Sequence, residues 1–213
     1  MIIIRNLSES TFSRSDIVSL LHLSFQERLD AGLDFTCSYI TEEYYKQKTE
    51  NSIIKVAIDS DSNILVGTVS TTLFTDRNGA SYGYMEYLAI HPDYKRKGIG
   101  TDLFQSLLAD LKSVDYLLSD TAVEAKSSVL FHQRNGFHII GLRSFSCTHY
   151  YSYLFRLQLS NKPFSQRVFH SRWVCYLLFV FSFIQTHLIK KNDGTYTAFW
   201  TAIRRIKNYF KSD

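Results

Sequence analysis

The chain has 213 residues, of which 45% are hydrophobic and 15% aromatic. This length and composition support a buried core and predict about one ordinary globular domain, which excludes a disordered chain. Its three cysteines, Cys37, Cys147 and Cys175, are far apart, with no CxxC pair and no Cys/His cluster at metal-ligand spacing. We therefore expect an intracellular protein with free thiols, no disulfide framework and no bound metal.

The net charge of +4 is unevenly distributed along the chain. Residues 161–213 contain nine Lys and Arg residues against two Asp, a net charge of +7, so residues 1–160 carry −3. The first 160 residues thus lack the wide basic face of a nucleic-acid-binding domain, and we expect no nucleic-acid partner.

Hydrophobic periodicity predicts alternating strands and helices up to about residue 158. In chain order, we expect a strand at 2–5, helices at 15–28 and 41–48, strands at 53–58, 64–74 and 82–90, a helix at 98–111, a strand at 116–122, a helix at 125–135, and strands at 137–142 and 148–157. Thr41 is a typical N-cap residue. Asn78-Gly79 indicates the turn of a hairpin between the third and fourth strands.

The most informative stretch is residues 87–101, YLAIHPDYKRKGIGT. A short apolar strand ends at His91-Pro92, a basic triplet follows at 95–97, and Gly98-Ile99-Gly100 opens an amphipathic helix. The start of a helix has unpaired backbone N–H groups and the positive end of the helix dipole, and glycine lets a ligand approach the backbone closely. The stretch therefore predicts a phosphate-binding loop.

This stretch resembles motif A of the GNAT superfamily of N-acetyltransferases, in which Arg/Gln-x-x-Gly-x-Gly/Ala opens a helix after a central strand. Lys95, Gly98 and Gly100 fall on that pattern, with Lys95 in place of Arg or Gln. Residues 127–141, SSVLFHQRNGFHIIG, are similar to the family's motif B. The resemblance covers a domain at residues 2–158. It implies the α/β GNAT fold, with a mixed, mostly antiparallel central sheet flanked by helices.

The resemblance also implies that acetyl-CoA is the acyl donor. The residues that it places against the donor are Leu88, Ala89, Ile90, Lys95, Arg96, Lys97, Gly98, Ile99, Gly100 and Thr101. We expect the acceptor to be a primary amine of a small molecule, such as an amino sugar or a sugar nucleotide. The alternative is a non-catalytic acyl-CoA-binding or assembly module that uses the same loop.

Glu86 is the candidate general base. It lies two residues before Leu88, so strand alternation predicts that the two side chains share one face of the sheet. A carboxylate in a strand of mostly apolar and aromatic residues would have a raised pKa if partly buried, which suits proton transfer from an ammonium group. Asp120, at the end of the next strand, is the reserve candidate. The alternative for Glu86 is a carboxylate that faces solvent or pairs with a lysine.

His132 is the candidate general acid. It occupies a position where the family commonly has a tyrosine that protonates the leaving thiolate. A histidine can donate a proton but titrates near neutrality. The alternative is that His132 only packs near acetyl-CoA. Tyr150 and Tyr151 are other possible proton donors.

Residues 161–213 are predicted to form a basic, aromatic helical extension. Residues 173–189 contain no charged side chain, and their length is at the lower limit for a membrane span. The three interpretations are a membrane span, a helical hairpin lying on an anionic membrane, and a helix pair that packs on the domain or on a second copy in a homodimer. We accordingly expect the protein in the cytoplasm or at the inner face of the membrane.

Overall fold

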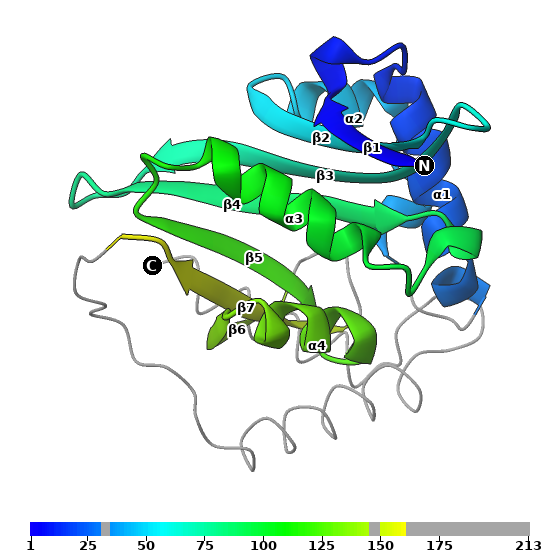
Figure 1. Cartoon of the computed structure of the whole chain (residues 1–213). Coiled ribbons are helices and arrows are strands. Elements are labelled where there is room, and N and C mark those ends of the chain that lie inside the picture. Colours follow the sequence, from blue (N-terminus) through cyan, green and yellow to red (C-terminus); the bar gives the residue numbers. More distant parts are fainter. Residues whose placement is uncertain (31–34, 145–149, 161–213) are drawn as a thin grey trace.

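The computed structural model describes residues 1–30, 35–144 and 150–160 (Figure 1). The predicted C-terminal extension at 161–213, with the membrane and dimer interpretations attached to it, lies outside the described residues. Within the described residues, no helix is both long and apolar enough to cross a membrane.

A seven-stranded sheet runs through the centre of the molecule in the order β1-β2-β3-β4-β5-β7-β6. The strands are β1 (Ile2–Asn6), β2 (Ser52–Asp59), β3 (Ile64–Thr75), β4 (Ser81–Ile90), β5 (Tyr116–Ala122), β6 (His138–Ser144) and β7 (Tyr151–Gln158). Neighbouring strands are antiparallel except β4 and β5, which are parallel. The predicted mixed, mostly antiparallel sheet is therefore confirmed.

Four helices cover the two faces of the sheet. They are α1 (Arg14–Asp30), α2 (Glu42–Lys48), α3 (Ile99–Asp110) and α4 (Lys126–Arg134). α3 and α4 lie on one face, and α1 and α2 lie on the other (Figure 1). Three short 3-10 helices, at Leu7–Glu9, Thr36–Ser38 and Pro92–Tyr94, were not predicted. They are single turns without a period long enough to detect in the sequence.

Local sequence accounts for where the helices begin. The Thr41 side chain accepts a hydrogen bond from the Tyr44 N–H at 3.2 Å, so the predicted cap of α2 is confirmed. α3 begins after Gly98 and buries Leu103, Phe104 and Leu107 along one side, as its amphipathic pattern predicts.

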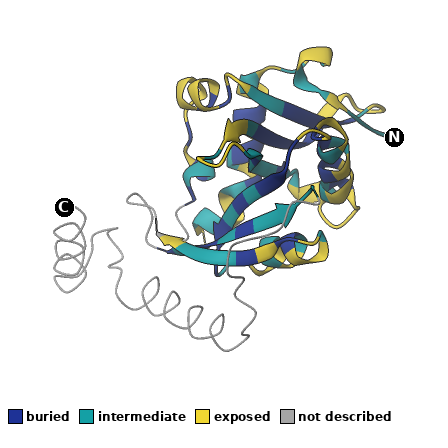
Figure 2. Cartoon of the chain, turned by 90° about the vertical axis from the view of Figure 1, so that its left-hand side faces the viewer, coloured by how far each residue is buried: buried dark blue, intermediate teal, exposed yellow. Residues whose placement is uncertain are grey.

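Two hydrophobic cores hold these layers together. The larger core lies between the sheet and the α3/α4 layer, and the second lies between the sheet and α1 and α2. Buried residues follow the strands, whereas the outer sides of the helices are exposed (Figure 2). All eleven predicted strands and helices are present. The last begins at Tyr151, and residues 148–149 at its expected start lie outside the described residues.

Candidate active site

A cleft opens where β4 and β5 stop pairing. Their last paired residues are Met85 and Ser119, although β4 continues to Ile90 and β5 continues to Ala122. A cavity of about 870 Å³ occupies this region. Its walls are the two strand ends, the loop before α3, the start of α4, and residues of α1 and α2. The strand end facing the cleft presents backbone groups that an extended ligand can pair with.

A β-bulge in β4 lies beside this opening. In the register with β3, Thr68 pairs with Ala89 and Ser70 pairs with Glu86, so two residues of β4 oppose one residue of β3. One of the two, Tyr87, has a left-handed backbone with φ of 55°. A bulge of this kind turns the strand and changes which face the following side chains point to.

The bulge separates Glu86 from Leu88. Met85 and Leu88 both pack in the core beneath α3, whereas Tyr87 packs with the core beneath α1. Glu86 follows Met85 by one regular step, so it points to the α1/α2 face, and its electrostatic partners include Lys48 of α2. The predicted shared face of Glu86 and Leu88 is therefore wrong, because the extra residue resets the alternation.

The loop before α3 exposes backbone donors to the cleft. Arg96 and Gly98 have left-handed φ angles of 61° and 84°. That conformation is free for glycine, but it costs roughly 1 kcal/mol for a residue with a side chain. The Gly98 carbonyl accepts the N–H groups of Thr101 at 2.9 Å and Asp102 at 3.1 Å. The amides of Ile99 and Gly100 precede these first helical hydrogen bonds, so they can bind an anion.

Gly100 lies where β4, α3 and α4 meet at the cleft. A Cβ atom at this position would lie 3.8 Å from Ile90 and 3.9 Å from Phe131, which are ordinary contact distances. The protein itself therefore leaves room for one methyl group here. A branched side chain would reach further into the space in front of the amides.

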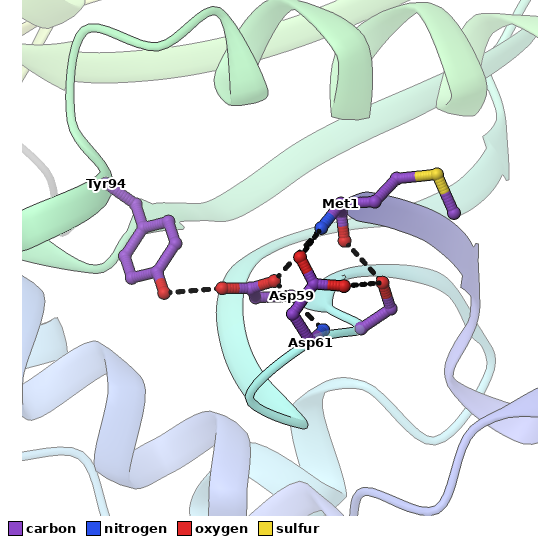
Figure 3. Close-up of polar contacts among 5 residues, drawn as sticks. Met1, Asp59, Asp61 and Tyr94 are labelled. Carbon is purple, nitrogen blue, oxygen red and sulfur yellow. Dashed lines mark hydrogen bonds and ion pairs between the residues drawn. The ribbon is translucent and has the colours of Figure 1, made fainter.

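Hydrogen bonds and ion pairs tie this loop to the β2–β3 turn (Figure 3). The Tyr94 hydroxyl donates to the Asp59 carboxylate at 2.7 Å, and the N-terminal ammonium of Met1 lies 3.4 Å from Asp59 and 2.6 Å from Asp61. The Tyr94 hydrogen bond is the main cause that lowers the pKa of Asp59 to about 2. The Lys97 Nζ atom lies 4.5 Å from the centre of the Tyr94 ring. These contacts fix Tyr94 and therefore the loop that follows it.

Nine of the ten predicted donor-binding residues line the cleft, and Lys97 is the exception. Lys97 instead lies over Tyr94. Lys95 lines the cleft and also forms a 3.1 Å ion pair with the exposed carboxylate of Glu27 on α1. Such a surface pair is weak, so the ammonium can also serve a ligand.

Glu86 and Asp120 both line the cleft, on β4 and β5. Burial, and then the nearby Asp120 carboxylate, raise the pKa of Glu86 to about 7, while Lys48 and Arg143 oppose the shift. Burial also raises the pKa of Asp120, whose carboxylate accepts a 2.5 Å hydrogen bond from the Tyr84 hydroxyl. Glu86 therefore exchanges a proton near neutral pH, whereas Asp120 is held by a protein donor.

His132 is buried at the base of the cleft, with 3% of its surface exposed. Its Nδ1 lies 2.7 Å from the Ser128 carbonyl, which can only accept, so Nδ1 carries the proton. Burial lowers the pKa of His132 to about 4, so the ring is neutral at pH 7, and Nε2 lies 2.9 Å from the Ser119 hydroxyl, whose one proton can go to Nε2 or to the Met85 carbonyl at 3.1 Å. Both ring nitrogens are engaged with protein, which disfavours His132 as an acid and favours the packing alternative.

The part of the cleft lining outside the loop segment 88–101, which we call the opposite wall, contains side chains that the sequence did not reveal. Lys48, Tyr84 and Arg143 line it from α2, β4 and β6, and Arg28 lines it from α1. Tyr150, a predicted alternative donor, also lines the cleft and packs 5.0 Å from the ring of Phe35. Because these residues come from separate elements, no local sequence pattern connects them. Among the described residues, no group of three or more His, Cys, Asp and Glu side chains is placed to hold a metal ion.

Comparison with known proteins finds matches to this chain both in sequence and in fold. A model of the "Acetyltransferase (GNAT) family" matches residues 16–137. One chain of the NatC complex bound to Gag peptide and CoA is 20% identical, with a TM-score of 0.58, over 75% of this chain and 99% of that chain. The acetyltransferase of GNAT family from Streptococcus pneumoniae is 16% identical, with a TM-score of 0.56, over 75% and 100%.

A third solved structure is yncA from Salmonella typhimurium with its cofactor acetyl-CoA. It is 13% identical, with a TM-score of 0.57, over 78% of this chain and 98% of that chain. At these identities the structural likeness establishes the fold. No curated protein sequence matches the chain.

Proposed function

The chain belongs to the acetyltransferase (GNAT) family and is thus an acetyltransferase, and we propose that its acceptor is the primary amine of a small molecule, such as an amino sugar or a sugar nucleotide. One observation carries this proposal. Where β4 and β5 stop pairing, a single cleft is lined both by the loop before α3, which can bind an anion, and by the carboxylate of Glu86.

The loop side fits the donor. The amides at the start of α3, with Lys95 and Arg96, would hold the pyrophosphate, and the unpaired backbone at 88–90 would hold the pantetheine arm. Gly100 supports this assignment because a Cβ atom there would meet the protein only at ordinary contact distances, so packing within the protein does not by itself require a glycine. Acetyl-CoA supplies the acetyl group as an activated thioester.

Glu86 would act as the general base on the other side. An amine must lose its ammonium proton before it can attack a carbonyl carbon. A carboxylate with a pKa of about 7 is ionised in a useful fraction at neutral pH and is still basic enough to take that proton, directly or through water. The bulge fits this role, since Glu86 follows Met85 in regular alternation onto the α1/α2 face, while the extra residue turns Leu88 to the α3 face.

The backbone of β4 would stabilise the transition state. A backbone N–H of the splayed segment would face the thioester oxygen and stabilise the oxyanion that develops on it. We assign His132 a positioning role, because it holds Ser119, the last residue of β5 paired with β4. A thiol of ordinary pKa, about 8.5, leaves readily as a thiolate, and water in the open cleft can protonate it.

Thiol release from acetyl-CoA across a panel of primary amines tests this function, with mass spectrometry of the products. We expect thiol release that depends on the amine and equals the amount of N-acetylated product. Acetyl-CoA binding without transfer to any amine would instead support the non-catalytic alternative.

A further inference from the structure

The wall of the cleft opposite the loop has an excess of positive charge. Three cationic side chains, Arg28, Lys48 and Arg143, line it against two carboxylates, Glu86 and Asp120. Three against two leaves one net positive charge when both carboxylates are ionised. With a pKa of about 7, Glu86 is protonated in about half of the molecules at neutral pH, which increases the excess.

The cations differ in how far the protein engages them. The Arg28 guanidinium lies over the rings of Phe25 and Phe35, at 5.3 and 5.0 Å, and donates to Ser127 at 3.5 Å. Burial lowers the pKa of Arg28, in keeping with its enclosure. Arg28 therefore belongs to the wall itself and is a poor candidate for contacting a ligand.

Arg143 lies close to the two carboxylates. Its Nη1 atom donates to the Tyr84 hydroxyl at 3.4 Å, and that hydroxyl donates to Asp120 at 2.5 Å. The charge of Arg143 lowers the pKa of both Asp120 and Glu86, and Lys48 acts on Glu86 from the α2 side. A ligand that places its amine at Glu86 thus has a guanidinium and an ammonium group within reach of its neighbouring atoms.

This arrangement selects among amines by charge. A polyamine would bring further positive charge next to the exposed side chains of Arg143 and Lys48, which is repulsive. An amine with an anionic group matches both signs, because a guanidinium fork binds a phosphate or carboxylate with two hydrogen bonds, and Lys adds a point charge.

We propose that the acceptor is an amine that also carries a phosphate or a carboxylate group, and that Arg143 and Lys48 bind this group while Glu86 receives the amine. The inference rests on the proposed acetyl transfer to a small amine. It specifies the acceptor more narrowly than that function does, and it assigns specificity to two side chains from α2 and β6.

Matched pairs of amines test the proposal on the full chain. The probes are ethanolamine with phosphoethanolamine, glucosamine with glucosamine 6-phosphate, and propylamine with β-alanine, and spermidine represents the polyamines. We expect kcat/KM to be about 10- to 100-fold higher for the anionic member of a pair. The phosphate and carboxylate pairs distinguish the two anionic groups. Raising the salt concentration should reduce this ratio for the unaltered protein, since salt screens partly exposed charges.

Two substitutions localise the effect. Arg143→Gln and Lys48→Gln should each lower kcat/KM about 10-fold more for the anionic amine than for its neutral partner, because any effect of the lost charge on the pKa of Glu86 acts on both amines. Lys46→Gln is the matched control, because Lys46 is exposed on the same short helix and does not line the cleft. Arg143→Lys, which keeps the charge, should retain part of the preference if Arg143→Gln fails to fold.

Three results would count against the inference. Equal loss for both members of a pair would show that Arg143 is only structural. A preference for neutral amines or spermidine would overturn the charge match. Turnover without any preference would overturn the inference alone, whereas no turnover with any of these amines would overturn the proposed function with it.

Discussion

The loop wall of the cleft takes its ligand-binding groups from one continuous segment, residues 88–101, and mostly from the backbone. The opposite wall collects side chains from α1, α2, β4, β5 and β6. A backbone site depends on helix geometry and on small residues, so it recognises a general group such as a pyrophosphate. A wall of assembled side chains can differ in charge from one protein to another, so it is where the choice of acceptor is made. Substitutions in each wall should therefore affect different steps.

In the loop wall, the largest loss of acetyl-CoA affinity is expected from a substitution of Gly100. Gly100→Val is expected to weaken acetyl-CoA binding by roughly two to three orders of magnitude, because the branched side chain occupies the space in front of the amides. Gly100→Ala is the control, since its Cβ would meet Ile90 and Phe131 only at ordinary contact distances. Calorimetry on the folded variants measures both affinities. Undiminished affinity in Gly100→Val would show that this wall does not bind the donor.

In the opposite wall, the buried carboxylate of Glu86 should lower the stability of the folded protein. The pKa of Glu86 is raised from 4.5 to about 7 by burial, so its ionised form is disfavoured in the folded protein. Between pH 4.5 and 7 the folded state holds more protons than the unfolded state, and stability falls as the pH rises. Glu86→Gln should therefore be more stable than the unaltered protein by up to about 3 kcal/mol above pH 7.

Urea unfolding at pH 4 and pH 8 measures this difference. The two proteins should be nearly equally stable at pH 4, where Glu86 is protonated whether the chain is folded or unfolded. Equal stability at pH 8 as well would mean that the carboxylate of Glu86 is well solvated.

His132, between the two walls, tests whether the buried ring only positions its neighbours. His132→Phe should lower stability by about 1–2 kcal/mol, because the Ser128 carbonyl loses its side-chain donor and the Ser119 hydroxyl loses one of its two hydrogen-bond partners. The shape of the kcat profile between pH 6 and 9 should not change, since the ring is neutral throughout that range. Loss of a limb of the profile in the variant would restore the acid role that the sequence suggested.

The smallest effect is expected at the entrance of the loop wall. Lys95→Gln should raise the KM for acetyl-CoA by about 3- to 10-fold through the lost charge. The same change should alter stability by less than about 1 kcal/mol, because the ion pair with Glu27 is at the surface. Glu27→Gln breaks the same pair and should leave this KM unchanged. A raised KM in Glu27→Gln would assign the effect to the pair.

The difference between the walls also explains what the sequence could predict. The strands, the four α-helices of the described residues and the loop with Gly98 and Gly100 depend on local periodicity and turn chemistry, and all were located, whereas the short 3-10 helices were not. The bulge at Tyr87 was missed because a tyrosine carries no signal for a left-handed backbone. Arg143 and Lys48 were missed because they lie far apart in the sequence, on β6 and α2, and only the folded chain brings both to the cleft.

The most direct test of the division between donor binding and amine activation is kcat as a function of pH for the unaltered protein and Glu86→Gln. With a saturating amine, the unaltered protein should show a rising limb with an apparent pKa near 7. Glu86→Gln should lack that limb, with kcat at pH 7 lower by roughly 10²–10⁴-fold and the same KM for acetyl-CoA. The deficit should shrink at high pH, where the amine loses its proton unaided. Superimposable profiles, or a near-normal kcat at pH 7, would contradict the account and move the role to Asp120 or to water.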